Sequence, residues 1–210
     1  MIRTNRRIRL LAAGLSALAG FVDATGFLNL GGFFVSFMSG NTTRFAVGLA
    51  QGAGAAAIAG GLIALFVLGV IVGTLLGHVA GKPRAPVLIG FVAALLALAA
   101  ACGMAGLNTG AVVAMTLAMG AENAIFAEGG EVHIGLTYMT GTLVKLGQHL
   151  ASALLGGKLF AWWPYFILWL GLASGAIAGA LLYPHLGLNG LWLASLAAAI
   201  LAMVSVRTQP

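Results

Sequence analysis

The stretch Met38-Ser39-Gly40-Asn41-Thr42-Thr43-Arg44 occurs again, about 101 positions later, as Met139-Thr140-Gly141-Thr142-Leu143-Val144-Lys145. Both copies place a hydroxyl residue, a glycine and a second small polar residue ahead of a cation. Other blocks recur in the same order: residues 20–24 correspond to 120–124, and Gly69, Gly73 and Gly77 to Gly171, Gly175 and Gly179. Such self-similarity indicates an internal repeat. The sequence therefore predicts one domain over residues 1–210, built from repeat halves 9–106 and 109–206.

The composition is typical of a chain embedded in a membrane. Of its 210 residues, 61% are hydrophobic and only 7% are charged, whereas soluble domains have about 25% charged residues. A spanning helix needs about 20 apolar residues, so the chain has room for roughly six to eight crossings joined by short loops. This composition excludes a soluble globule and leaves almost nothing for an extramembrane domain.

Each half contains four apolar segments, of which the second is shorter and more polar than the others. The start of the chain resembles a secretory signal peptide, but apolar sequence continues past the small-residue stretch ending at Ala19. We therefore interpret it as a retained first helix. The expected segments lie at about 9–29, 33–52, 56–79 and 86–106, and at about 109–127, 134–154, 160–182 and 188–206.

The loop charges predict the topology. If segments 33–52 and 134–154 cross the membrane, Lys82 and Arg84 fall on the side of the outer loops, against the positive-inside rule. If these segments enter and return, each half has three spans and the second half is inverted. All basic loops and both termini then face the cytoplasm. The sequence thus predicts an all-α polytopic membrane protein with about six transmembrane helices, two short re-entrant or broken half-helices and an inverted 3+3 repeat.

The repeated motif predicts a helix break at membrane depth. Glycine permits a tight turn, and Asn41 and Thr142 are the expected N-caps of two half-length helices. Their N-termini would bring free N–H groups and partial positive charge to one place near the bilayer midplane. With Arg44 and Lys145 one turn further on, the substrate is expected to be a small anionic or acceptor-rich solute or ion. The candidate substrate-binding residues are Ser39, Gly40, Asn41, Thr42, Arg44, Thr140, Gly141, Thr142, Lys145 and Asn123.

Asp23 and Glu122 are acids inside the first span of each half. Acids within a membrane indicate either coupling to a proton or a sodium ion, or ion pairs with Arg44 and Lys145. Both interpretations stay open. Asp23 aligns with Asn123 and not with an acid, so the two halves differ at this position. This asymmetry favours a single coupling site over a symmetric pore.

Glycines at G-x-x-x-G spacing let helices approach closely. We expect the third segments, 56–79 and 160–182, to pack against each other. An interface between copies, giving a homo-oligomer, is the lesser alternative. Trp162, Trp163 and Tyr165 follow Lys158 and predict an aromatic belt at the cytoplasmic interface.

The sequence shows no catalytic residues, metal site or cofactor motif, so we expect neither an enzyme nor a cofactor. Glu128, Glu131 and His133 lie close together without metal-ligand spacing. Cys102 is the single cysteine, which excludes a disulfide framework. No P-loop or G-x-S-x-G frame is present. Basic residues crowd the start of the chain without forming a stripe, so the bilayer is the expected partner and nucleic acid is not.

Three stretches carry a family resemblance: GFVDATGFLNLGGFFVSFMSGNTTRFAVGLA at 20–50, MGAENAIF at 119–126 and LTYMTGTLVKLGQHLA at 136–151. They resemble the YoaK-like family of bacterial integral-membrane proteins, whose domain has unknown function. Its hallmarks correspond here to Asp23-Ala24, residues 38–41, residues 120–124 and residues 140–142. Many members carry Gln where this chain has Glu122. The resemblance implies a bacterial inner-membrane protein and supplies no substrate.

Together these patterns predict a membrane transporter or channel for a small solute, more readily an anion, with a site between two half-helix N-termini. A coupled carrier and an open pore both remain open. The alternative is a non-transporting membrane scaffold or assembly partner, packed through its glycine-rich helices.

Overall fold

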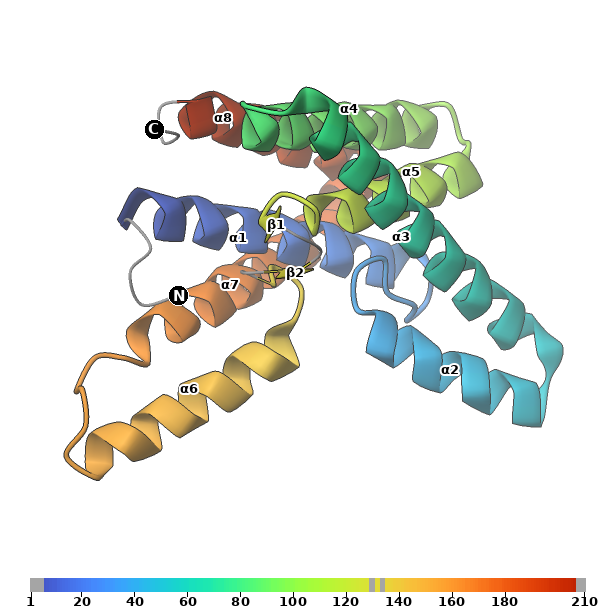
Figure 1. Cartoon of the computed structure of the whole chain (residues 1–210). Coiled ribbons are helices and arrows are strands. Elements are labelled where there is room, and N and C mark those ends of the chain that lie inside the picture. Colours follow the sequence, from blue (N-terminus) through green and yellow to red (C-terminus); the bar gives the residue numbers. More distant parts are fainter. Residues whose placement is uncertain (1–5, 129–130, 133–134, 207–210) are drawn as a thin grey trace.

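The computed structural model describes residues 6–128, 131–132 and 135–206, and the side chains of 6–126 and 135–206. The acidic loop with Glu128, Glu131 and His133 lies outside the described side chains, and Arg3 and Arg207 lie outside the described residues. The elements are mainly helical (Figure 1). In chain order they are α1 (Arg6–Asn29), α2 (Met38–Gln51), α3 (Ala53–Ala80), α4 (Arg84–Met104), α5 (Asn108–Glu122), β1 (Ala127–Glu128), β2 (Glu131–Val132), α6 (Met139–Leu154), α7 (Trp163–Leu186), the 3₁₀ helix η1 (Gly187–Gly190) and α8 (Leu191–Val206).

Four helical stretches of the described chain are long and apolar enough to cross a membrane. They are Arg6–Asn29, Ala53–Ala80, Arg84–Met104 and Trp163–Val206. The last of them contains both α7 and α8, and the chain reverses direction between them at η1 (Figure 1). The helix α5 is also apolar but has only 15 residues, and it ends at Glu122 instead of continuing to residue 127 as the sequence predicted. Apart from the short strands β1 and β2, the described chain is helical, and the expectation of a helical membrane protein is confirmed.

The helices pair across the two halves. The first helix of one half, α1, packs along α7 of the other, and α5 likewise packs along α3. The final helices, α4 and α8, lie side by side (Figure 1). The centre of the core lies on α1 and α5, where Leu15, Val22, Met115 and Met119 are fully buried.

Glycines make these cross-half contacts possible. A Cβ built at Gly179 would lie 2.6 Å from the carbonyl oxygen of Phe21 on α1, and one at Gly73 would lie 2.8 Å from the Cα of Ala121 on α5. The expectation that the third segments pack against each other was therefore wrong. G-x-x-x-G spacing specifies a smooth helix face but not the partner. The first helix of each half also contributes a glycine to these contacts. A Cβ at Gly120 on α5, for example, would overlap the carbonyl oxygen of Phe66 on α3.

The glycine contacts also correct the alignment of the repeats. Gly175 faces Ala17 on α1, and Gly69 faces Leu117 on α5. Since residues 17 and 117 correspond, Gly69 is the structural equivalent of Gly175. This equivalence is one helical turn away from the one that the sequence suggested.

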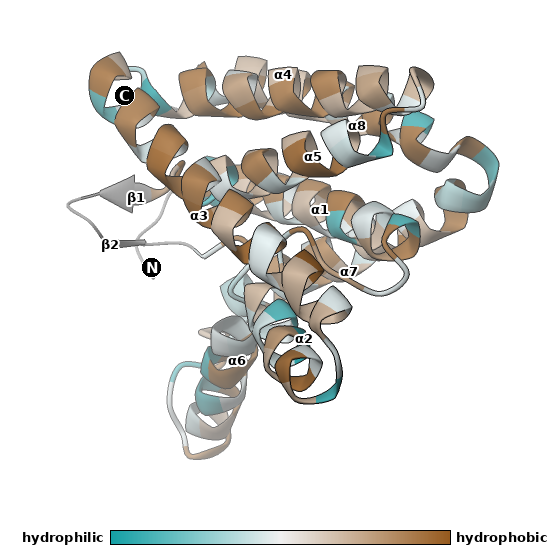
Figure 2. Cartoon of the chain, turned by 90° about the vertical axis from the view of Figure 1, so that its right-hand side faces the viewer, coloured by the Kyte–Doolittle hydropathy of each residue, from teal (hydrophilic) through white to brown (hydrophobic). Residues whose placement is uncertain are grey.

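The helices α2 and α6 lie at the edge of the bundle. Both begin near the centre of the molecule and run outwards in opposite directions (Figure 1). The helix α2 packs on α3, and α6 packs on α7. Only Asn41 and Gly48 are buried on α2, and only Thr142 on α6. These two helices also carry more hydrophilic colour than α4 (Figure 2).

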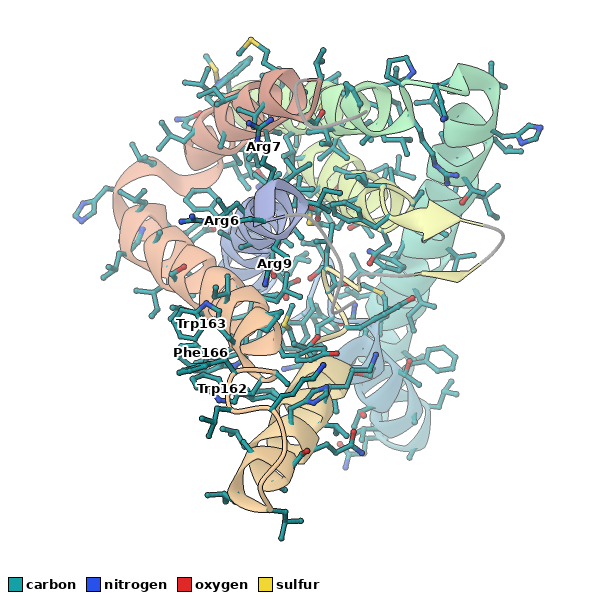
Figure 3. All side chains as sticks on the ribbon, turned by 60° about the vertical axis from the view of Figure 1, so that its left-hand side comes forward. Arg6, Arg7, Arg9, Trp162, Trp163 and Phe166 are labelled. Atoms are coloured by element: carbon teal, nitrogen blue, oxygen red, sulfur yellow. The ribbon has the colours of Figure 1, made fainter. Side chains whose placement is uncertain are left out.

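One end of the molecule gathers basic and aromatic side chains. Arg6, Arg7 and Arg9 at the start of α1 lie at the same end as Trp162, Trp163 and Phe166 around the start of α7 (Figure 3). The ring centroids of Trp162 and Trp163 are 5.5 Å apart, and Phe166 contacts both rings. Aromatic rings beside basic residues are typical of a membrane interface.

Candidate functional site

A cavity of about 250 Å³ lies where α2 and α6 begin. Each helix contributes its first turn and the two residues before it, and Phe66 from α3 completes the wall. Among the side chains that the structure describes, none that lines this cavity is acidic or basic. The lining residues are Ser36, Phe37, Met38, Ser39, Phe66, Thr137, Tyr138, Met139, Thr140 and Gly141.

The two halves supply equivalent residues to this cavity. Ser36 corresponds to Thr137, Phe37 to Tyr138, and Ser39 to Thr140. Each half thus contributes two Ser or Thr hydroxyl groups and an aromatic ring, and the ring of Tyr138 adds a phenolic hydroxyl group.

Neither helix N-terminus is capped by a side chain. The cap positions are Phe37 for α2 and Tyr138 for α6, and neither makes a side-chain capping hydrogen bond. The first N–H groups of an α-helix have no partner within the helix, and its N-terminus carries about half a positive charge. Here the first N–H of each helix, at Met38 and at Met139, donates to the carbonyl oxygen of Ser36 or Thr137. Two helix N-termini therefore face one small cavity whose described lining carries no charged side chain.

The expectation that Asn41 and Thr142 are N-caps was wrong. Both helices begin three residues earlier, at Met38 and Met139. The break in the first half lies upstream, where Gly31 and Gly32 adopt positive φ angles of 62° and 107°. At those φ angles glycine carries no steric penalty, which is why the chain turns there and not at Gly40.

Asn41 and Asp23 instead hold the broken segment before α2. The Asn41 side chain donates to the carbonyl oxygen of Phe34 at 2.6 Å and accepts from its N–H at 3.1 Å. Asp23 Oδ1 accepts from the N–H groups of Val35 and Ser36, at 2.9 and 2.7 Å. The two side chains thereby satisfy backbone groups that a continuous helix would have paired.

The second half uses the corresponding positions in a related way. Thr137 donates its hydroxyl to Asn123 Oδ1 at 3.0 Å, and Asn123 donates to the carbonyl oxygen of Met119 at 2.9 Å. Thr142 donates to the carbonyl oxygen of Tyr138 at 3.1 Å. Asn123 and Thr142 therefore support the cavity wall without lining it.

Arg44 and Lys145 do not reach the central cavity. The Arg44 guanidinium lies over the ring of Phe33, 5.0 Å from its centroid, and lines a separate cavity between α2 and α3. Lys145 is exposed on α6. Within the described chain, the Asp23 carboxylate bonds to backbone N–H groups and Glu122 has no partner. The ion-pair interpretation of these four residues therefore finds no support in the geometry.

Glu122 occupies an unusual environment at the end of α5. Its side chain is fully buried, and neither carboxyl oxygen has a hydrogen-bond partner in the part of the chain described. Nearby, Arg84 donates to the carbonyl oxygen of Ala124 at 3.0 Å, while its own Nε is buried without a partner. An unsatisfied buried carboxyl group is costly, which makes Glu122 a candidate for a functional role.

Of the residues predicted from sequence, Ser39, Thr140 and Gly141 line the cavity. Gly40 packs under the rings of Phe34 and Phe37, and Thr42 is exposed. The prediction missed Ser36, Thr137 and the aromatic pair. A longer comparison would have found them, because Val35-Ser36-Phe37-Met38-Ser39-Gly40 matches Leu136-Thr137-Tyr138-Met139-Thr140-Gly141 position by position.

The fold and the cavity define a polytopic helical membrane protein with an internal repeat in its sequence. Residues 11–204 match the family described as "Protein of unknown function (DUF1275)", and the chain belongs to this family. It is also 42% identical over 191 residues to the "UPF0700 transmembrane protein RA0705" of Rhizobium meliloti (strain 1021), covering 91% of this chain and 83% of that protein. No solved structure matches the chain.

Proposed function

We propose that this protein is a transporter or channel for a small anionic solute, which binds in the cavity between α2 and α6. The observation that carries the proposal is that two uncapped helix N-termini, one from each half, line a single cavity. Such termini bind anions through N–H groups and the helix dipole. Discontinuous helices that meet between repeats are a common arrangement in transporters.

The chemistry of the cavity supports an anion. Ser39 and Thr140 offer hydroxyl donors, because the Thr137 hydroxyl already donates to Asn123. Among the described side chains, no carboxylate lines the wall to repel negative charge. The volume of about 250 Å³ is below the roughly 300–1,000 Å³ of sites for drug-sized ligands, which favours a solute of a few heavy atoms.

We further propose six spans, an inverted 3+3 repeat and re-entrant α2 and α6. The reciprocal packing of α1 on α7 and of α5 on α3 supports a structural repeat, because a twofold axis that exchanges the halves produces it. The positions of Lys82, Arg84 and Lys158 in or beside the loops favour the inverted orientation. The basic and aromatic end of the molecule favours a cytoplasmic N-terminus and C-terminus (Figure 3). The resemblance to the YoaK-like family supports a bacterial inner membrane.

In this proposal the two intramembrane acids have different roles. Asp23 is occupied by two backbone N–H groups, so we assign it to holding the helix break. Glu122 has no such task, and we assign it to coupling if the protein is a carrier. An open pore would need no coupling group. The proposal involves no enzymatic step and no cofactor, and its partners are the bilayer and a small solute.

The alternative role as a membrane scaffold depends on free glycine faces. Gly69, Gly73, Gly175 and Gly179 are all used in contacts between the two halves of one chain. They are therefore not available as an association surface for a partner or for a second copy, and the scaffold has less support than transport.

Flux measurements in proteoliposomes test the proposal. A panel of small anions, cations and neutral metabolites is compared between the wild type and a Ser39→Ala/Thr140→Val variant, which lacks two cavity hydroxyls. Thr42→Val is the matched control, because Thr42 lies one turn along α2 without lining the cavity. We expect anion flux that falls in the double variant and persists in the control. No flux of any solute, or equal loss in both variants, would contradict the proposal.

A further inference from the structure

Glu122 is an acid that the fold buries without using it in any bond. Its side chain is fully buried, and within the part of the chain described neither carboxyl oxygen has a hydrogen-bond partner. Glu122 is also the last residue of α5, and a helix C-terminus carries about half a negative charge. Burial and the helix end both oppose a carboxylate at this place, whereas a bound proton removes the charge.

The charged and titratable groups on the helices that pack against α5 leave Glu122 unpaired. These helices are α3, α4 and α1. On α4, Arg84 donates to the carbonyl oxygen of Ala124. On α3, His78 is exposed, and on α1 Asp23 accepts from backbone N–H groups. The other charged residues of α1 are Arg6, Arg7 and Arg9. None of these groups bonds to a carboxyl oxygen of Glu122.

The end of α5 contacts two residues that line the central cavity. Asn123, which follows Glu122 in the chain, accepts the hydrogen bond of the Thr137 hydroxyl at 3.0 Å, and Thr137 lines the cavity. Gly120, in the same last turn, lies against the carbonyl oxygen of Phe66, which lines the cavity as well. A change in the charge of Glu122 therefore acts next to two parts of the cavity wall.

The surroundings of Glu122 favour a proton over a metal cation as its ligand. A metal cation is held by several oxygen ligands at once, whereas a proton needs one. The carbonyl oxygens of Gly120, Ala121 and Glu122 each accept an N–H group of the turn that follows, and Asn123 Oδ1 accepts from Thr137. Over the described residues, no three His, Cys, Asp or Glu side chains form a cluster that could hold a metal ion.

We propose that Glu122 is a proton-binding site and that it couples anion movement to protons. The carboxylate takes up one proton from the water on one side of the membrane, becomes a neutral carboxylic acid, and is a carboxylate again once that proton is released on the other side. A carboxylate so close to the cavity wall repels an anion and the neutral acid does not, so the proton and the anion favour each other's binding. One proton moving with one monovalent anion carries no net charge. Only the coupling rests on the proposed function; the proton site does not.

Infrared difference spectroscopy of the full chain in lipid vesicles tests the proton site. A protonated carboxyl group has a C=O stretching band that a carboxylate lacks. The chain has only four Asp and Glu residues, so Asp23→Asn/Glu128→Gln/Glu131→Gln leaves Glu122 as its single acidic side chain. We expect a band that loses about 90% of its intensity one pH unit above its midpoint in the wild type and in this triple variant. The band should be absent in Glu122→Gln.

Sodium chloride and choline chloride at equal ionic strength distinguish the two ligands. The midpoint should be the same in both salts, and a midpoint that falls in sodium chloride would assign the site to sodium and overturn the proposal. A wild type without a titrating band, or a band that persists in Glu122→Gln, would also overturn it. If Glu122→Gln does not fold, the triple variant still decides, because it keeps Glu122.

The coupling is tested in proteoliposomes with the anions that the wild type carries. An acidic outer solution should drive accumulation of a monovalent anion, and a membrane potential set with potassium and valinomycin should leave this flux unchanged. The flux through Glu122→Gln should not respond to the pH gradient. If Glu122 titrates but the wild-type flux ignores the gradient, the coupling is wrong. If no anion is carried, the proposed function and the coupling both fail, and the infrared titration still decides the proton site.

Discussion

Replacing Gly73 by alanine probes the packing that joins the two halves. A Cβ at this position of α3 would lie 2.8 Å from the Cα of Ala121 on α5 and 3.0 Å from its carbonyl oxygen. Carbon atoms in contact prefer a separation of about 3.5–4.0 Å. The two helices must therefore separate by roughly 1 Å, and overpacking of this kind costs about 1–3 kcal/mol.

We expect Gly73→Ala to lower the Tm by roughly 2–12 °C, because 1 kcal/mol shifts a chain of this size by about 2–4 °C. Gly61→Ala is the matched control on the same helix, since Gly61 is exposed and a Cβ there meets nothing within 4 Å. Alanine favours a helix over glycine by about 1 kcal/mol, so this control should be unchanged or more stable. The assay is thermal unfolding of the purified protein in detergent. A Gly73→Ala protein as stable as the wild type would refute the reasoning.

Three further substitutions separate structural from functional roles. Asp23→Asn should fold normally, because an amide oxygen can still accept from the N–H groups of Val35 and Ser36. Asp23→Ala should lower the free energy of unfolding by about 1–3 kcal/mol for each N–H left unpaired. Thermal unfolding measures both variants. Glu122→Gln should not lower the Tm, because the amide fills the same space and cannot carry a buried charge. The variant should lose the coupling of flux to a pH gradient. A lower Tm would show that the carboxyl group has a partner that the amide cannot replace. Asn41→Leu should leave membrane insertion intact but abolish flux, because the backbone of Phe34 loses both hydrogen bonds to the Asn41 side chain. Full flux in this variant would show that the segment around Phe34 is not needed for the site.

The sequence predicts the helical membrane character and the place of the cavity, because these depend on composition and on a repeated motif. Composition predicts a helical membrane protein, and the motif at Met38 and Met139 marks the place where the two halves meet. The cavity residues Ser39, Thr140 and Gly141 follow from that motif. The segment boundaries are also close, with α2 at Met38–Gln51 inside the expected 33–52.

What the sequence could not predict depends on partner choice and local backbone geometry. A glycine stripe shows that a helix approaches another closely, but not that Gly73 meets α5 instead of α7. The helix break was placed at Gly40 because it lies in the repeated motif, whereas the positive φ angles occur at Gly31 and Gly32. The position of Arg44 in the repeated motif predicted a place in the central site, but its guanidinium group lies over the ring of Phe33 and does not line the central cavity.

The most direct test of the central claim is to fill the cavity and measure anion flux. Gly141 lines the cavity and Gly147 lies on the same helix outside it, and a Cβ at either position meets nothing within 4 Å. A Cβ can therefore be added at either position without displacing a neighbour, and the rest of a leucine side chain at position 141 would extend from the cavity wall. We predict that Gly141→Leu abolishes flux in proteoliposomes while Gly147→Leu conducts like the wild type. Undiminished flux in Gly141→Leu would contradict a solute path between the N-termini of α2 and α6.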